Sequence, residues 1–140
     1  MKLPPDVQFH EDVRLLVWRP RGVLNEAAVE HILTLIGDLE ASSEKKPFKR
    51  FTDATAAEAI DLNFRYVFDF ALFRRLSYAG RPPVKSAILV TSFTAAHYSK
   101  LHEMLTRGPS IKVRIFEERE AAARWLGVPV EILIISPIGS

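Results

Sequence analysis

The sequence contains no cysteine. Disulfide bonds, thiolate zinc sites and thiol catalysis are therefore excluded. No apolar run reaches the roughly 18 residues that a membrane-spanning helix needs, and the opening stretch MKLPPDVQFHED lacks the apolar core of a signal peptide. These two absences make a cytoplasmic protein the expectation.

Charge of one sign is scarce as well. The chain carries 19 Lys and Arg residues against 17 Asp and Glu residues, which gives a formal net charge of only +2. The basic residues are scattered among acidic ones rather than gathered into a stripe. Nucleic-acid binding is therefore not predicted.

Catalytic and metal-binding motifs are also missing. The sequence has no G-x-S-x-G elbow, Walker loop, G-x-G-x-x-G fingerprint or H-E-x-x-H helix. Of its 4 histidines, only His97 and His102 are expected on one helix. Their separation of five residues places them about 140° apart, which is unfavourable for joint metal binding. We therefore expect no metal and no cofactor.

What the sequence does have is an apolar pattern whose period changes repeatedly between that of a strand and that of a helix. The expected strands are residues 7–9, 13–18, 48–52, 84–90 and 111–116, the first two joined as a hairpin around Glu11 and Asp12. The expected helices are residues 25–39 with Asn25 as N-cap, 63–78, 92–106 with Ser92 or Thr94 as N-cap, and 117–126 ended by Gly127.

Strands that alternate with helices are typical of an α/β fold with right-handed crossovers. We therefore expect a single layered domain over residues 1–140, with a mostly parallel central sheet of about five strands, an N-terminal antiparallel hairpin and about four helices. Residues 129–140 are expected to form an edge strand or a tail. As an exposed edge, the weakly charged segment VEILII (residues 130–135) would favour pairing into a homodimer.

The expected helix over residues 63–78 is apolar almost all round. The face toward the sheet would carry Phe64, Val67, Phe68, Ala71 and Leu72, and the face away from it would carry Tyr66, Phe70 and Phe73. A helix of this kind should be buried on both sides. The sequence leaves open whether the second cover is the rest of the domain, a partner subunit or a hydrophobic ligand.

Polar residues follow the expected strands at the sheet edge where the carboxyl ends of parallel strands meet. They are Asp53, Thr55, Asp61, Asn63, Thr91, Ser92 and Glu117. Ligands of open α/β sheets bind at this edge because loops and helix N-termini converge there. The alternative interpretation is helix capping, since Asp61, Asn63 and Ser92 are residue types that begin helices.

The chain resembles the STAS-like, SpoIIAA-like group of small bacterial domains, which overlap in fold with CRAL-TRIO lipid-binding proteins. The resemblance rests on the opening hairpin, on VRLLVWRPRG before the Asn25-capped helix, on the loop after FKRFTD, and on the ending VRIFEEREAAARWLGVP. In the anti-sigma-factor antagonists of that group, a serine at the start of the helix after the third strand is phosphorylated. The corresponding residue here is Asn63, which cannot accept phosphate, and Thr55 is the nearby hydroxyl.

Together these features predict a non-enzymatic domain that acts through regulatory protein interaction. The alternative is a carrier or sensor of a small hydrophobic, lipid-like ligand, held in an enclosed cavity of about 300 Å³ or more. The residues expected to bind ligand or partner are Asp53, Thr55, Asp61, Asn63, Tyr66, Phe70, Phe73 and Ser92. A remote third alternative is a small acid/base enzyme that uses Asp53, Asp61 and His97, with Asn63 beside them.

Overall fold

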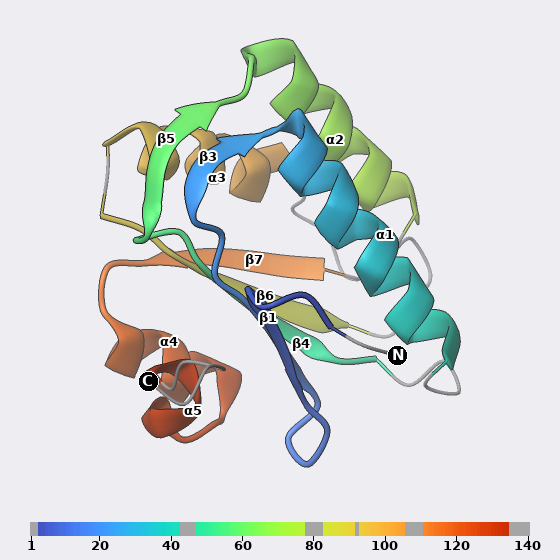
Figure 1. The fold of residues 1–140 in the computed structure, drawn as a ribbon, viewed down its shortest axis with the longest axis vertical. Helices are drawn as coiled ribbons and strands as arrows, with labels where there is room; N and C mark the ends of the chain where they lie inside the picture. Colours follow the sequence, from blue (N-terminus) through green and yellow to red (C-terminus); the bar gives the residue numbers. More distant parts are fainter. Residues whose placement is uncertain (1–2, 43–46, 78–82, 92, 106–110, 135–140) are drawn as a thin grey trace.

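The computed structural model describes residues 3–42, 47–77, 83–91, 93–105 and 111–134 (Figure 1). The strands are β1 (Val7–His10), β2 (Leu15–Trp18), β3 (Gly22–Asn25), β4 (Lys49–Asp53), β5 (Ala57–Asp61), β6 (Val84–Leu89) and β7 (Ile111–Phe116). The helices are α1 (Glu26–Ser42), α2 (Phe64–Ser77), α3 (Phe93–Leu105), α4 (Arg119–Leu126) and α5 (Val130–Ile134).

Five strands form the main sheet, in the order β1-β2-β4-β6-β7. β1 and β2 are antiparallel, whereas the pairs β2-β4, β4-β6 and β6-β7 are parallel. The hairpin turn is closed by the Arg14 N–H, which donates to the Glu11 carbonyl at 3.3 Å. The predicted α/β fold, with a mostly parallel sheet and an N-terminal antiparallel hairpin, is confirmed.

The helices cover the sheet in two layers, with α1, α2 and α3 on one face and α4 and α5 on the other (Figure 1). Asn25 begins α1 as predicted, because its Oδ1 accepts the Ala28 N–H at 3.0 Å. Gly127 ends α4 with a φ of 73°, in the left-handed region that favours glycine. None of the helices in the described part of the chain is long and apolar enough to cross a membrane.

The face toward α4 and α5, called the closed face here, holds one continuous core. Alternate residues of β2, β4 and β6 point to it, among them Leu15, Phe51 and Ala87, each of which is 0% exposed. Ala122 and Ala123 of α4 meet them, and such small side chains let the helix approach the sheet closely.

Two segments, the one that ends at Asn25 and the one that follows Asp53, differ from the prediction, since no strand was expected before Asn25 and a loop was expected through Ile60. β3 and β5 pair there as a separate two-stranded parallel sheet, with Asn25 opposite Asp61. All five β5 residues are exposed or only half-buried, so the strand lacks the in-out alternation by which strands are recognised in a sequence.

The C-terminal segment also differs from the prediction. Residues 130–134 form the helix α5, so the predicted edge strand, and a dimer paired through it, are wrong for this segment. The physical reason is the turn at Gly127, which directs the chain back onto the sheet, where Leu133 is 0% exposed. Arg19 secures this arrangement, since its Nη2 donates to the Leu133 carbonyl at 2.6 Å. Residues 135–140 of the predicted strand or tail lie outside the described residues.

Candidate functional site

A cavity of ≈150 Å³ lies between the sheet and the layer formed by α1, α2 and α3. We call this side of the sheet the hollow face. Its apolar residues form two separate clusters, one around Leu16, Ile32 and Ile36 under α1, and one around Val90 and Ala95 at α3. The cavity is lined by members of both clusters. It therefore lies between the two clusters.

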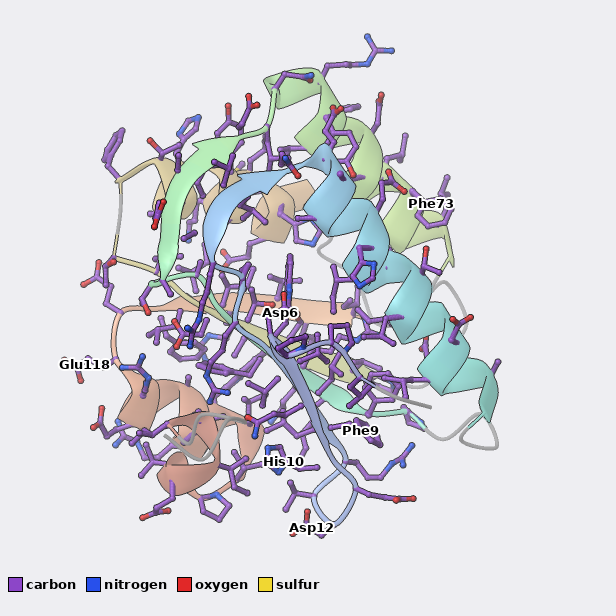
Figure 2. All side chains as sticks on the ribbon, viewed as in Figure 1. Asp6, Phe9, His10, Asp12, Phe73 and Glu118 are labelled. Atoms are coloured by element: carbon purple, nitrogen blue, oxygen red, sulfur yellow. The ribbon has the colours of Figure 1, made fainter. Side chains whose placement is uncertain are left out.

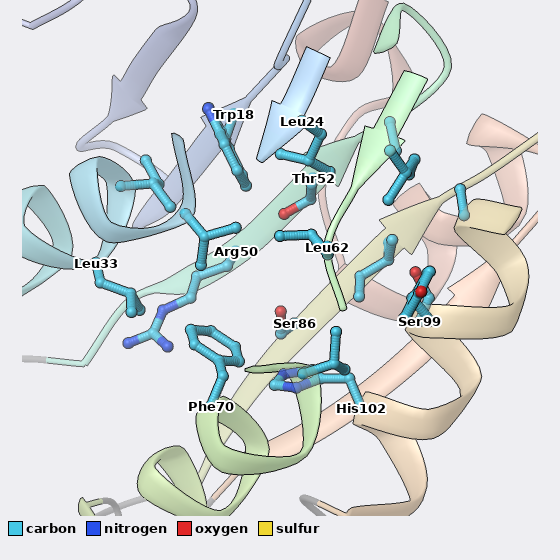
Figure 3. A pocket seen from close by; sticks show the side chains of 18 of the residues that line it. Trp18, Leu24, Leu33, Arg50, Thr52, Leu62, Phe70, Ser86, Ser99 and His102 are labelled. Carbon is cyan, nitrogen blue, oxygen red and sulfur yellow. The ribbon is translucent and has the colours of Figure 1, made fainter. Parts of the chain in front are cut away.

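Among the polar side chains of the cavity wall, three are buried, and they come from the sheet and from α3. Arg50 of β4 is 4% exposed, Ser86 of β6 is 3% exposed and His102 of α3 is 6% exposed. Arg50 donates from Nη2 to Glu40 Oε2 at 3.3 Å, and its guanidinium lies 5.4 Å from the Phe48 ring centre. Figure 3 shows these three side chains around the cavity together with Phe70.

α2 covers the cavity with Tyr66, Val67 and Phe70. The Phe70 ring lies 5.0 Å from the His102 ring and 6.4 Å from the Tyr66 ring, measured between centroids. The face assignment made for this helix from the sequence is therefore wrong in part. Tyr66 and Phe70 face the interior beside Val67, whereas Phe68, which was expected on the sheet, is 42% exposed.

The start of α2 is tied to α1 by polar contacts. Asn63 begins α2, since its Oδ1 accepts the Tyr66 N–H at 2.7 Å, and its Nδ2 donates to Glu26 Oε1 at 3.4 Å. The Tyr66 hydroxyl donates to Glu30 Oε1 at 3.0 Å. Burial, and next the hydrogen bond to Glu30, raise the pKa of Tyr66, so the phenol stays protonated and continues to donate across the two helices.

The outer face of α2 is apolar and exposed. It carries Phe68, Leu72, Phe73 and Leu76, with exposed fractions of 42%, 44%, 61% and 68%. Figure 2 shows Phe73 projecting from α2 away from the sheet. Exposed apolar side chains gathered on one helix face are typical of an interaction surface.

Asp53 lies at the carboxyl edge of the sheet, where the sequence placed it, and is held by three contacts. Its Oδ1 accepts the Thr55 N–H at 3.0 Å and the Thr55 hydroxyl at 2.5 Å, and its Oδ2 accepts Arg119 Nη2 at 2.9 Å. Arg119 belongs to the first turn of α4. These contacts secure α4 to the sheet, which gives Asp53 and Thr55 a structural role at this edge.

The structure brings only some of the predicted site residues together. Asp53 meets Thr55, and Tyr66 meets Asn63 and Phe70, whereas Phe73 points outward. Within the described residues, no hydrogen bond or ion pair joins the exposed Asp61 or His97 to Asp53. The acid/base alternative stays a prediction, and Ser92 lies outside the described residues.

Arg50, Ser86 and His102 were not identified as site residues from the sequence. A signal existed for two of them, because Arg50 lies two residues from Phe48 and Ser86 lies two residues from Val84 within expected strands. Residues two apart on a strand share a face, so each polar side chain was in phase with a buried apolar one. Within the part of the chain that the structure describes, no group of three or more His, Asp or Glu side chains is placed to hold a metal ion.

Comparison with known proteins identifies the fold. No protein-family model and no curated protein matches the chain. Among solved structures it is similar to an uncharacterised protein of the DUF3478 family from Shewanella loihica. The two chains share 17% sequence identity over 86% of this chain and 90% of that chain, with a TM-score of 0.56. That protein has a SpoIIAA-like fold, and the SpoIIAA-like fold predicted for the present chain is thereby confirmed.

Proposed function

We propose that the protein is a non-enzymatic STAS-like binding domain whose cavity holds a small, mostly apolar molecule with one polar end. The observation that supports this is the cavity of ≈150 Å³, lined mainly by apolar residues with Arg50, Ser86 and His102 in its wall. Apolar surroundings with a few fixed polar groups are typical of ligand sites, because the former provide affinity and the latter orientation.

The volume of the cavity limits the size of this ligand. It is smaller than the about 300 Å³ expected for a carrier of a lipid-like molecule. An apolar cavity of about 150 Å³ in another protein accommodates benzene. We therefore expect a ligand no larger than a substituted benzene ring, and not a long acyl chain.

The proposal can be tested with toluene and p-cresol, which share an apolar body and differ by one hydroxyl group. Titration of methyl-labelled protein, followed by NMR, should give saturable shifts at Ile32, Ile36 and Val67, which line the cavity. We expect p-cresol to bind about 5-fold more tightly, as one net hydrogen bond to the polar wall would produce.

A blocked variant provides the matched comparison. Ala95 is 3% exposed and lines the cavity, so Ala95→Leu should fill it and abolish binding of both molecules. Met104→Leu, on an exposed part of the same helix, should leave binding unchanged. The proposal is refuted if neither molecule binds wild-type protein, or if Ala95→Leu binds both as well as wild type does.

Regulatory protein interaction through the outer face of α2 is the second candidate function. The exposed row of Phe68, Leu72 and Leu76 supports it, because residues four apart on a helix share a face that could pair with the same row on a second copy. Sedimentation velocity should then show a dimer that Leu72→Glu converts to a monomer. A wild-type protein that stays monomeric at high concentration would contradict this candidate.

A further inference from the structure

The outer edge of β7 is a second surface with the properties of a binding site. β7 is the last strand of the five-stranded sheet, and among the described residues its one strand partner is β6 (Figure 1). A groove of ≈440 Å³ follows it, lined by every residue from 111 to 115 and by Lys100 and Glu103 of α3. Side chains of a strand alternate between its faces, so a lining of five consecutive residues means that the groove runs along the backbone edge.

The charged side chains of β7 itself are both basic. Lys112 and Arg114 are exposed and lie two residues apart, hence on the same face of the sheet. Lys85 of β6 is exposed too and lies directly opposite Lys112 in the strand register. Like charges in this position repel each other, so the pairing of Lys85 with Lys112 is electrostatically unfavourable.

Lys85 and Arg114 contact a carbonyl group and aromatic rings. Lys85 Nζ donates to the Trp125 carbonyl at 2.8 Å, and the Arg114 guanidinium lies 5.6 Å from the Trp125 ring and 5.5 Å from the Phe116 ring. As far as the described residues extend, no carboxylate forms an ion pair with Lys112 or Arg114. In the groove wall, Lys100 is paired with Glu103 at 3.0 Å.

These charges also bear on which chain can pair with the edge. If two copies paired antiparallel around Val113, Lys112 of one would lie opposite Arg114 of the other, and the like charges would repel. Basic residues on an edge strand oppose self-association in this way. A chain with acidic residues at alternate positions would instead place carboxylates beside both cations.

We propose that the β7 edge binds an extended segment of a partner protein that carries Asp or Glu at alternate positions. The segment adds a sixth strand to the sheet, with main-chain hydrogen bonds providing affinity and the two basic side chains providing selectivity. This interaction is separate from the cavity and does not depend on the proposed ligand.

The test uses an eight-residue peptide of alternating glutamate and threonine, with its lysine–threonine counterpart as control. NMR shifts should appear at β7 amides with the glutamate peptide only. Methylation of alternate peptide nitrogens should abolish binding, since it removes the donors needed for strand pairing. If the methylated peptide binds equally well, the contact is charge alone and strand addition is overturned.

A variant that replaces two cations tests the selectivity. The double substitution Lys112→Gln and Arg114→Gln should weaken glutamate-peptide binding at least 10-fold. Arg21→Gln with Arg65→Gln removes two exposed charges elsewhere and should leave it unchanged. The proposal is overturned if both double variants behave alike, if the glutamate peptide does not bind, or if oligothymidylate or phosphatidylglycerol vesicles bind this edge in its place.

Discussion

The two faces of the sheet differ in how completely their helices fill them. The closed face is covered by two short helices, α4 and α5, of 8 and 5 residues, and has one continuous core. The hollow face is covered by three longer helices of 17, 14 and 13 residues, yet it contains the cavity. The amount of helix over a sheet therefore does not decide how well it is packed.

Side-chain size and polarity account for the difference. On the closed face, Ala122 and Ala123 let α4 lie close to Phe51 and Leu15. On the hollow face, the bulky side chains of Tyr66 and Phe70 of α2 line the cavity, and the polar side chains of Arg50, Ser86 and His102 form part of its wall. A void leaves its lining without partner atoms, so the hollow face forgoes stability that a ligand would restore.

The largest contrast should come from two neighbouring leucines of β2, one on each face. Leu15 is 0% exposed on the closed face, and Leu16 is 2% exposed and lines the cavity. We expect Leu15→Ala to lower the free energy of unfolding by about 3–5 kcal/mol and Leu16→Ala by about 2–3 kcal/mol. The smaller loss follows because part of the Leu16 side chain already borders empty space.

Urea denaturation of both variants measures the difference, with an unchanged m-value as the control for two-state behaviour. Equal losses for the two leucines would mean that the cavity is filled or collapsed in solution, and the comparison between the faces would fail.

Enlarging an alanine on each face should give effects of opposite sign. Ala87 is 0% exposed in the closed core, so Ala87→Leu should overpack it and cost about 1–3 kcal/mol. Ala95 lines the cavity, so Ala95→Leu should stabilise the protein by about 0.5–1 kcal/mol. Thermal unfolding followed by circular dichroism checks both, and a destabilised Ala95→Leu would show that the cavity lacks room for the added carbons.

The sequence allowed much of this sheet to be predicted, because β6 and β7 show clear strand patterns bounded by turn residues. In β7, Ile111 and Val113 are buried while Lys112 and Arg114 are exposed, as the alternation indicated. The hairpin and the Asn25 cap were readable for the same reason, since both depend on local sequence. The cavity was not readable, because it results from the fit of three helices that are distant in the chain.

The orientation of α2 could not be predicted for a different reason. A helix that is apolar almost all round has no periodic stripe to indicate which side faces the sheet. Its rotation is set instead by tertiary contacts, namely the Tyr66–Glu30 hydrogen bond and the packing of Phe70 on His102. Glu30 and His102, which make these two contacts with α2, cannot be identified from the residues of the helix itself.

The hydrogen bond between Tyr66 and Glu30 provides a smaller test of the hollow face. Tyr66→Phe keeps the ring over the cavity and removes only the donor, so we expect a loss of about 0.5–1.5 kcal/mol. Hydrogen exchange of α2 amides should accelerate, while that of α4 amides stays constant. Equal acceleration in both helices would mean that the bond stabilises the whole fold and does not act locally.

The smallest expected effect concerns a histidine at the rim of the closed face. His10 pairs with Leu15 in the hairpin, and burial lowers its pKa, with Asp12 opposing and Arg19 reinforcing the shift. Because the folded pKa lies below the unfolded value of about 6.5, the unfolded chain binds the proton first. The free energy of unfolding should therefore fall as the pH drops from about 6.5 to the folded pKa, and level off below it.

His10→Gln removes this titration and keeps a polar side chain at the position. Between pH 7.5 and pH 5.5, the urea midpoint of wild-type protein should fall further than that of the variant, since all other titrating groups are common to both. Equal falls would mean that His10 is hydrated in the folded protein. The closed face would then be open to water at its rim, and its contrast with the hollow face would be confined to the centre of the sheet.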